Sequence, residues 1–216
     1  MLSFQTILPH TLELLKKLAA QPEIANLRLV GGTSLALQYG HRQSVDLDFF
    51  GSFATTQEDL LQMVQRFGSY TILNQTKNIL QLTINGIKVD FVNYSCYEWI
   101  DEPIIEDGIT LASPRDIAAL KINAIEGRGT KKDFVDIFVL LQHFSLDEIL
   151  TFYKNKYPEH SEFRALLSLT YFEDADAQPL PQMFITPSWE EMKQTIIAHV
   201  KRYQLSSNDQ ATVKQG

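Results

Sequence analysis

Residues 27–50 read LRLVGGTSLALQYGHRQSVDLDFF, and this stretch decides the fold of the first half of the chain. A short apolar run over 27–30 ends at two glycines, and the residues after them predict a short helix over 33–39. Apolar and acidic residues follow one another over 45–50, which predicts a strand. A strand, a glycine turn, a helix and a second strand in this order indicate a mixed α/β unit.

The rest of the chain divides into a sheet-rich part and a helical part. Further strands are expected over 70–73, 79–84 and 87–92, the last two joined by Asn85-Gly86, a strong signal for a hairpin turn. Helical spacing dominates after residue 112, with helices expected over 113–126, 130–142, 146–157, 162–171 and 188–203. The sequence therefore predicts an α+β fold with three parts: an α/β core over 1–112, a helical lobe over 113–204 and a flexible tail over 205–216.

Composition limits the class of protein. The chain has 216 residues, of which 44% are hydrophobic, enough for a packed core. No apolar run reaches the roughly 18 residues that a membrane span needs, and the N-terminus lacks the features of a signal peptide. The single cysteine, Cys96, excludes a disulfide within the chain. We expect a cytoplasmic protein without a membrane partner, and the net charge of −7 gives it no general basic surface for nucleic acid.

The acidic pair Asp46 and Asp48 is the first candidate site. On a strand, residues i and i+2 point to the same face, so both carboxylates would project one way while Val45, Leu47 and Phe49 project the other way. Two like charges side by side repel each other, and a divalent cation with a preference for oxygen ligands would resolve that conflict. The alternative is a strand end that dips into solvent.

Asp90 is a third carboxylate, on the expected strand that leaves the Asn85-Gly86 hairpin. If this strand pairs beside 45–50, Asp90 faces Asp46 and Asp48. It would then be a third ligand for Mg²⁺ or Mn²⁺, or the base for an attacking hydroxyl. The alternative is an edge-strand carboxylate that blocks aggregation. Three carboxylates on apolar strands favour the metal site, because burying them without a partner is costly.

The sequence Gly31-Gly32-Thr33-Ser34 is a candidate phosphate site. Two glycines allow a ligand to approach the backbone closely. The start of the helix after them would offer free N–H groups and a partial positive charge, and the two hydroxyl groups would add donors. The alternative is an ordinary strand–helix turn in which Thr33 or Ser34 caps the helix.

Basic and acidic residues of the helical part complete the candidate set. Lys121 lies on an apolar helical stripe, where a lysine is usually a side chain that extends along the surface to reach water. Here it could instead bind phosphate, and Arg128 and Lys132 make the following segment locally basic. Asp133 and Asp136 share one helical face. They would either orient Lys121 or Arg128, touch the substrate, or simply favour the helix dipole in the first turn.

Together these motifs resemble the AbiEii/AbiGii toxin family, nucleotidyltransferases of the DNA polymerase beta superfamily. The resemblance covers about residues 28–142 and consists of the Gly-Gly motif, Asp-x-Asp, the lysine and the KDxxD helix. It implies a minimal nucleotidyltransferase fold and transfer of a nucleotide from an NTP to an acceptor, with release of pyrophosphate. The family's toxins are paired with antitoxins and some modify tRNA, so phage defence, a tRNA or protein acceptor and an antitoxin partner are expected here.

The resemblance also implies roles for individual residues. Nucleotide binding would fall to Gly31, Gly32, Thr33, Ser34, Lys121, Arg128 and Lys132. Mg²⁺ or Mn²⁺ would be held by Asp46 and Asp48, and catalysis would require Asp46, Asp48, Asp90, Lys121 and Asp133. Two other functions stay open. One is a nucleotidyltransferase that acts on a small cationic molecule such as an aminoglycoside, and the other is a nucleotide- or partner-binding module without turnover.

Overall fold

The structure, a computed structural model, describes residues 1–213 and divides into two compact units. The first unit comprises Met1–Ser113 together with Gln182–Phe184. It is built on one mixed sheet of seven strands in the order β3-β4-β5-β2-β1-β7-β6. The strands are β1 Leu27–Val30, β2 Leu47–Gly51, β3 Tyr70–Thr76, β4 Ile79–Ile84, β5 Ile87–Asn93, β6 Ile104–Glu106 and β7 Ile109–Leu111.

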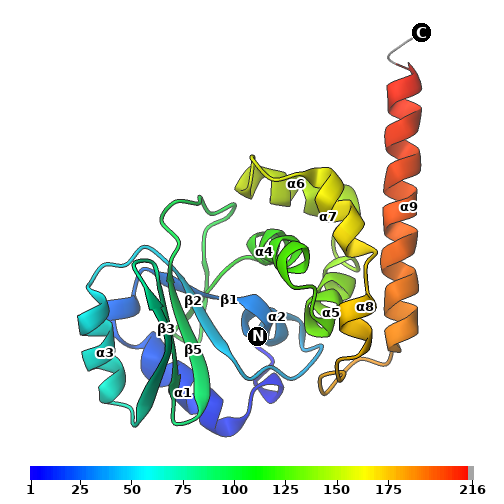
Figure 1. The fold of residues 1–216 in the computed structure, drawn as a ribbon. Helices are drawn as coiled ribbons and strands as arrows, with labels where there is room; N and C mark the ends of the chain where they lie inside the picture. The colour runs from blue at the N-terminus through cyan, green and yellow to red at the C-terminus, as the bar shows by residue number, and fades with distance from the viewer. Residues whose placement is uncertain (214–216) are drawn as a thin grey trace. The chain divides into compact units, whose positions relative to one another are not determined.

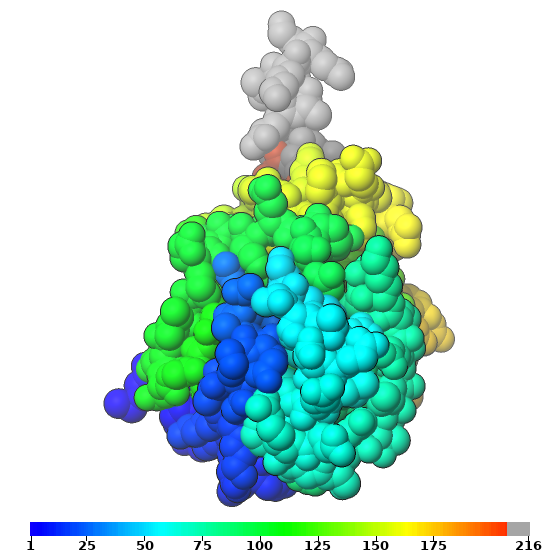
Figure 2. All heavy atoms as spheres, turned by 90° about the vertical axis from the view of Figure 1, so that its left-hand side faces the viewer, coloured from blue at the N-terminus to red at the C-terminus, as the bar shows by residue number. Residues whose placement is uncertain are grey.

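Helices of the first unit pack with the apolar side chains of the sheet in one core. They are α1 Pro9–Ala19, α2 Gly31–Tyr39 and α3 Gln57–Gln65, with short 3-10 turns at Phe4–Thr6 and Pro22–Ile24. Leucines of α1 and α3 join Leu47, Phe49 and Phe91 of the sheet in one core cluster. Figure 1 shows the sheet with these helices, and Figure 2 views the side on which α3 forms the surface. The polar side chains of the same strands are therefore left for the opposite face.

The three central strands fix which residues share that opposite face. β2 runs antiparallel to β1 and parallel to β5, and the register pairs Asp48 with Val30 on one side and with Asp90 on the other. The hairpin between β4 and β5 turns at Asn85-Gly86, both with positive φ, as the turn signal predicts. The prediction that the strand carrying Asp90 pairs beside the strand carrying Asp48 is thus confirmed.

The second unit, Pro114–Pro181 with residues 185–216, is helical in its described part. Its helices are α4 Pro114–Gly127, α5 Lys131–Leu140, α6 Leu146–Lys156, α7 Glu162–Leu169, α8 Glu173–Asp176 and α9 Trp189–Val213. α4 packs against α5, α6 and α7, and α9 packs against α5, α6 and α7. The fully buried pair Lys156 and Asp116, with Nζ and Oδ1 2.8 Å apart, ties α6 to α4.

The structure corrects several expected boundaries in the first unit. β2 begins at Leu47 rather than at Val45, whose side chain is 47% exposed and not on the core face. Asp46 therefore precedes the strand, and the same-face argument applies to Asp48 alone. α2 begins at Gly31 rather than after the glycines. The strands β6 and β7 were not expected, because three residues are too few to show an alternating pattern.

The C-terminal boundary also differs from the expectation. A flexible tail is predicted over 205–216, but α9 continues to Val213, and residues 214–216 lie outside the described part. The sequence 205–213 contains neither glycine nor proline, so nothing in it ends the helix. α8 was likewise not expected. In the described residues, every helix is too short or too polar to cross a membrane.

Candidate active site

The turn from β1 into α2 brings the backbone against a carboxylate. Gly31 has a φ of +67°, a left-handed conformation that glycine adopts without penalty. A Cβ atom added at this position would lie 2.6 Å from Oδ2 of Asp48. Glycine is therefore required here for two reasons, the backbone conformation and the close approach of Asp48.

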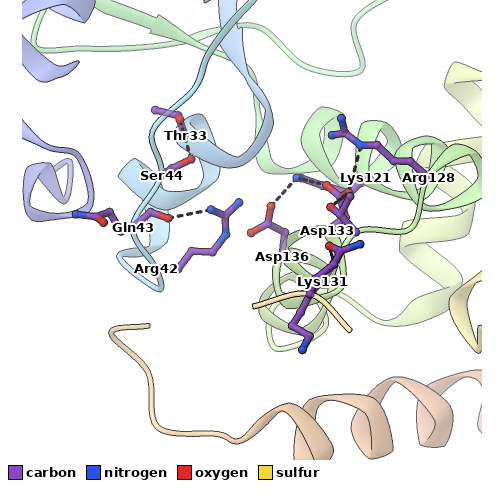
Figure 3. A network of polar contacts seen from close by, with 11 residues as sticks. Thr33, Arg42, Gln43, Ser44, Lys121, Arg128, Lys131, Asp133 and Asp136 are labelled. Carbon is purple, nitrogen blue, oxygen red and sulfur yellow. Dashed lines mark hydrogen bonds and ion pairs between the residues drawn. The ribbon is translucent and has the colours of Figure 1, made fainter. Parts of the chain in front are cut away.

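The second glycine makes room for a buried arginine that the sequence analysis did not single out. A Cβ atom at Gly32 would clash with the guanidinium group of Arg42. Arg42 is buried and donates a hydrogen bond to the backbone carbonyl of Gln43 at 3.0 Å, as Figure 3 shows. Arg42 stands four residues before Asp46, and its burial is not expected from the sequence, because an isolated arginine in a loop is usually exposed.

The hydroxyl groups of Thr33 and Ser34 do not face solvent, contrary to their expected role as phosphate donors. Both residues are buried. The Thr33 hydroxyl bonds to that of Ser44 at 2.8 Å (Figure 3) and to the backbone carbonyl of Asp46, and the Ser34 hydroxyl accepts from Gln38. Neither side chain caps α2. The Thr33 hydroxyl thus fixes the loop that carries Asp46, and the Ser34 hydroxyl is used within α2. The backbone N–H groups of the first turn are left as the donors for a phosphate.

The carboxylates of the first unit lie at different depths. Asp48 and Asp90 are directly paired neighbours on the parallel strands β2 and β5, and in such a pair both side chains project from the same face of the sheet. Asp90 is only 6% exposed, whereas Asp46 and Asp48 are half-buried. Two carboxylates in register on one face repel each other unless a cation lies near them.

Lys88 supplies positive charge to these acids. Its ammonium lies 2.8 Å from Oδ2 of Asp90, the same atom that accepts a hydrogen bond from Gln81 at 2.7 Å. Burial acts most strongly on the pKa of Lys88 and lowers it. The hydrogen bond that Lys88 donates to Asp90 and the charges of Asp90, Asp48 and Asp46 outweigh that effect, so the pKa of Lys88 lies above its usual value. The lysine therefore stays charged beside the acids.

The remaining oxygen of Asp90 indicates that the site suits a cation. Oδ1 is buried and has no hydrogen-bond partner among the described residues. A buried carboxylate oxygen without a partner is costly, and carboxylate oxygens are the ligands that Mg²⁺ prefers. Within residues 1–213, however, no three His, Cys, Asp or Glu side chains already converge as a metal-binding group. The donor chemistry fits Mg²⁺ or Mn²⁺, while the carboxylates are in register rather than gathered around one point.

The second unit holds its own buried charge cluster. Lys121 of α4 is 5% exposed, and its ammonium lies 2.8 Å from Oδ1 of Asp133 and 2.5 Å from Oδ2 of Asp136, both on α5 (Figure 3). Both aspartates are fully buried. Lys121 therefore does not extend along the surface to water. Of the alternatives left open by the sequence, the contacts match the one in which the two acids orient Lys121.

Asp133 is the most densely contacted member of this cluster. Its Oδ2 also accepts from the Thr130 hydroxyl and lies 3.4 Å from Nε of the exposed Arg128. Burial has the largest effect on the pKa of Asp133 and raises it. The charge and hydrogen bond of Lys121, the Thr130 hydroxyl and Arg128 together reverse this, so the pKa is below its usual value. Asp133 is thus a carboxylate anion at neutral pH.

The two lysines that open α5 differ in their surroundings. Lys132, the predicted nucleotide-binding residue, is partly exposed. Lys131 is buried, with its ammonium 3.2 Å from the backbone carbonyl of Asp176 and 5.1 Å from the ring centre of Trp189. Lys131 therefore anchors the start of α5 to the rest of its unit. The sequence gave no signal that separates the two lysines.

Comparisons with known proteins agree with this architecture. Residues 13–211 match the family model described as nucleotidyl transferase AbiEii toxin, type IV TA system. A curated relative, an uncharacterised protein of Aquifex aeolicus (strain VF5), is 34% identical over 198 residues, which cover 88% of this chain and 94% of the relative.

Solved structures share the fold at low sequence identity. A putative nucleotidyltransferase from Helicobacter pylori is 18% identical, with a TM-score of 0.56 over 90% of this chain and 94% of that one. The nucleotidyltransferase toxin MenT4 of Mycobacterium tuberculosis is 15% identical, with a TM-score of 0.54 over 87% of this chain and 79% of that one. The predicted α+β nucleotidyltransferase fold is confirmed. Because the family model spans nearly the whole sequence, the chain belongs to the AbiEii family of nucleotidyltransferase toxins of toxin–antitoxin systems.

Proposed function

We propose that this nucleotidyltransferase moves a nucleotide from an NTP to a hydroxyl group of a tRNA or a protein, in a reaction that requires Mg²⁺ or Mn²⁺. The acceptor hydroxyl gives its proton to water as its oxygen forms a bond to the α-phosphorus. The bond between the α-phosphorus and the bridging oxygen breaks, and pyrophosphate leaves with that oxygen. The observation that carries the proposal is the register of Asp48 with Asp90, next to a glycine turn that only glycine can fill.

In this proposal the first unit holds the metal and part of the triphosphate. Asp46, Asp48 and Asp90 are the metal ligands, and the bound cation neutralises charge on the phosphates during transfer. The backbone N–H groups at Gly31 and Gly32 bind phosphate oxygens, as the start of a helix commonly does. Thr33 and Ser34 support this turn from inside through the hydrogen bonds described above.

The second unit carries basic residues whose charge suits a phosphate. We assign phosphate binding to Lys121, Arg128 and Lys132, with Asp133 and Asp136 as the carboxylates that hold Lys121 in position. Catalysis of phosphoryl transfer consists mainly of positioning and charge stabilisation. A lysine fixed between two buried carboxylates loses little freedom when it meets a phosphate. The biological role that follows from the family is that of a toxin in phage defence, neutralised by an antitoxin partner.

A label-transfer assay tests this function. The purified chain is incubated with Mg²⁺, with each α-labelled NTP in turn, and with either total tRNA or total protein of the host cell. We expect label in one of the two pools, and the productive NTP reveals the base preference. Asp48→Asn is expected to lower the transfer rate by at least about a thousandfold, because a catalytic metal supplies several kcal/mol of charge stabilisation.

Matched controls separate loss of chemistry from loss of fold. Asp107→Asn changes the same charge on an exposed turn where asparagine also tolerates the positive φ, so it should leave the rate unchanged. Asp48→Asn should melt at the wild-type temperature or slightly above it, because one of two repelling carboxylates is gone. Wild-type transfer activity in a folded Asp48→Asn chain would refute the metal assignment. Absence of label from both pools would refute the tRNA and protein acceptors.

A further inference from the structure

Lys88 and Asp90 form an ion pair at the centre of the proposed metal site. The two residues are two positions apart on β5, so their side chains share one face of the sheet. Nζ of Lys88 lies 2.8 Å from Oδ2 of Asp90, and the lysine side chain is 39% exposed. The ammonium of Lys88 thus lies beside the Asp90 carboxylate, while the rest of the side chain is partly exposed to water.

The two oxygens of Asp90 are used unequally. Oδ2 accepts hydrogen bonds from both Lys88 and Gln81, whereas Oδ1 is buried without a hydrogen-bond partner among the described residues. Gln81 is the register partner of Asp90 on β4, so its bond would hold the carboxylate even if the lysine left. Asp90 therefore has one anchored oxygen and one that is satisfied only by something absent from the chain itself.

We propose that Lys88 is a displaceable counter-ion of the metal site, which neutralises the acids when no metal is bound and competes with the divalent cation for them. This inference rests on the proposed function and deepens it, because it names a positioning residue that the nucleotidyltransferase motifs do not include. A divalent cation carries twice the charge of the ammonium and can bind Oδ1 as well as other carboxylate oxygens. The lysine then turns outward into solvent, which its partial exposure permits.

This role has a measurable consequence for metal affinity. Asp48 and Asp90 are in register on one face, where like charges repel each other, and the ammonium of Lys88 beside Asp90 relieves that repulsion. Binding of a metal must then overcome the ion pair and the positive charge next to it. The affinity of the wild-type chain for the metal is therefore lower than the same carboxylates would give without Lys88.

Direct binding of Mn²⁺ to the full chain, followed by electron paramagnetic resonance of the free ion, tests the proposal without any turnover. Lys88→Met keeps the length of the side chain and removes its charge. We expect its Kd for Mn²⁺ to fall about threefold to tenfold, the range for a nearby exposed charge. Lys88→Arg keeps the charge and should stay close to wild type. Lys77→Met, at an exposed lysine before β4, should also bind Mn²⁺ as the wild type does.

Epistasis with Asp90 distinguishes competition from a general change of charge. In an Asp90→Asn background, the Lys88→Met substitution should tighten Mn²⁺ binding less than it does in the wild type, because the ion pair is already broken and only the nearby positive charge is left to remove. Thermal melting by circular dichroism confirms that each variant is folded.

Two kinds of result would overturn the inference in distinguishable ways. If the wild type binds Mn²⁺ and Asp48→Asn does not, but Lys88→Met binds no more tightly, the counter-ion role is wrong and the proposed function stands. If the wild type and Asp48→Asn bind Mn²⁺ equally, the metal site itself is wrong, and the inference fails together with it. If Lys88→Met tightens Mn²⁺ binding by the same factor in the Asp90→Asn background as in the wild type, direct competition is also refuted.

Discussion

The two units solve the problem of clustered carboxylates in different ways. In the first unit, Asp48 and Asp90 lie in register with one partly exposed lysine beside them, and a buried oxygen of Asp90 lacks a partner within the described residues. In the second unit, Asp133 and Asp136 are fully buried against the buried ammonium of Lys121. The first cluster keeps one carboxylate oxygen without a hydrogen bond among the described residues, and the second contains its own internal cation.

This difference separates a site prepared for a ligand from a site that is already assembled. A buried ion pair holds both side chains in place, because a buried charge without its partner is strongly destabilising. A buried carboxylate oxygen without a partner, such as Oδ1 of Asp90, instead costs stability until a cation binds it. The comparison teaches that similar residue types, an acid pair and a lysine, can hold an external ion in one unit and orient an internal one in the other.

The largest expected effect on stability comes from removing each lysine in turn. Lys121→Met takes the ammonium away from two buried carboxylates and should lower the free energy of unfolding by about 3 kcal/mol or more. The matched change Lys88→Met breaks a partly exposed pair and should cost under about 1 kcal/mol. Urea denaturation followed by circular dichroism measures both. Equal losses in the two variants would show that the clusters do not differ in kind.

A smaller effect is expected from the glycine that faces Asp48. Gly31→Ala places a Cβ 2.6 Å from the Asp48 carboxylate at a positive φ, and should lower the free energy of unfolding by about 1–2 kcal/mol. Gly108→Ala is a matched control, since Gly108 also has a positive φ but would meet nothing within 4 Å. Both variants should lose stability to the positive φ, and Gly31→Ala should lose more in urea denaturation because its Cβ also meets the Asp48 carboxylate.

Only the Gly31 variant should change the acid site. Its new methyl group must displace the Asp48 carboxylate, so Mn²⁺ binding and nucleotide transfer should both weaken, whereas Gly108→Ala should leave them at the wild-type level. If both variants bind Mn²⁺ normally, the close approach of Gly31 and Asp48 has no bearing on the metal site.

The first unit could be predicted well where local signals were strong. Asn85-Gly86 forced a hairpin, which placed Asp90 on a strand, and the apolar pattern around it selected the face. The sequence signals failed where tertiary contacts determine the bounds of a strand. Val45 looks like a core residue but precedes the strand, and β6 and β7 are too short for a pattern to be visible.

The charge clusters show the same limit. Sequence spacing put Asp133 and Asp136 on one face, but it could not show that Lys121 is buried between them, because burial depends on how α4 packs against α5. Nor could it show that Lys88 contacts Asp90, since a lysine on a strand is ordinarily a solvated residue. Arg42 escaped notice for the related reason that its burial is set by Gly32, ten positions earlier in the chain.

The smallest expected effect is the pH dependence of the second cluster. The pKa of Asp133 in the folded chain lies below its usual value despite the opposing effect of burial, because Lys121, Thr130 and Arg128 favour the anion. A carboxyl group whose pKa is lower in the folded state stabilises that state fully above the unfolded pKa, about 3.9 for aspartate. This contribution disappears as the pH falls through the folded pKa.

Asp133→Asn cannot lose a proton, so it isolates this contribution. The wild type should exceed the variant in free energy of unfolding by a constant amount between about pH 5 and 7, and the gap should narrow below about pH 4. Urea denaturation at a series of pH values measures the gap, with Asp107→Asn as the exposed control. A gap that widens in acid would mean that Asp133 is held protonated in the folded chain. Lys121 would then lack one of its two anionic partners, and the contrast between the two clusters would lose its basis.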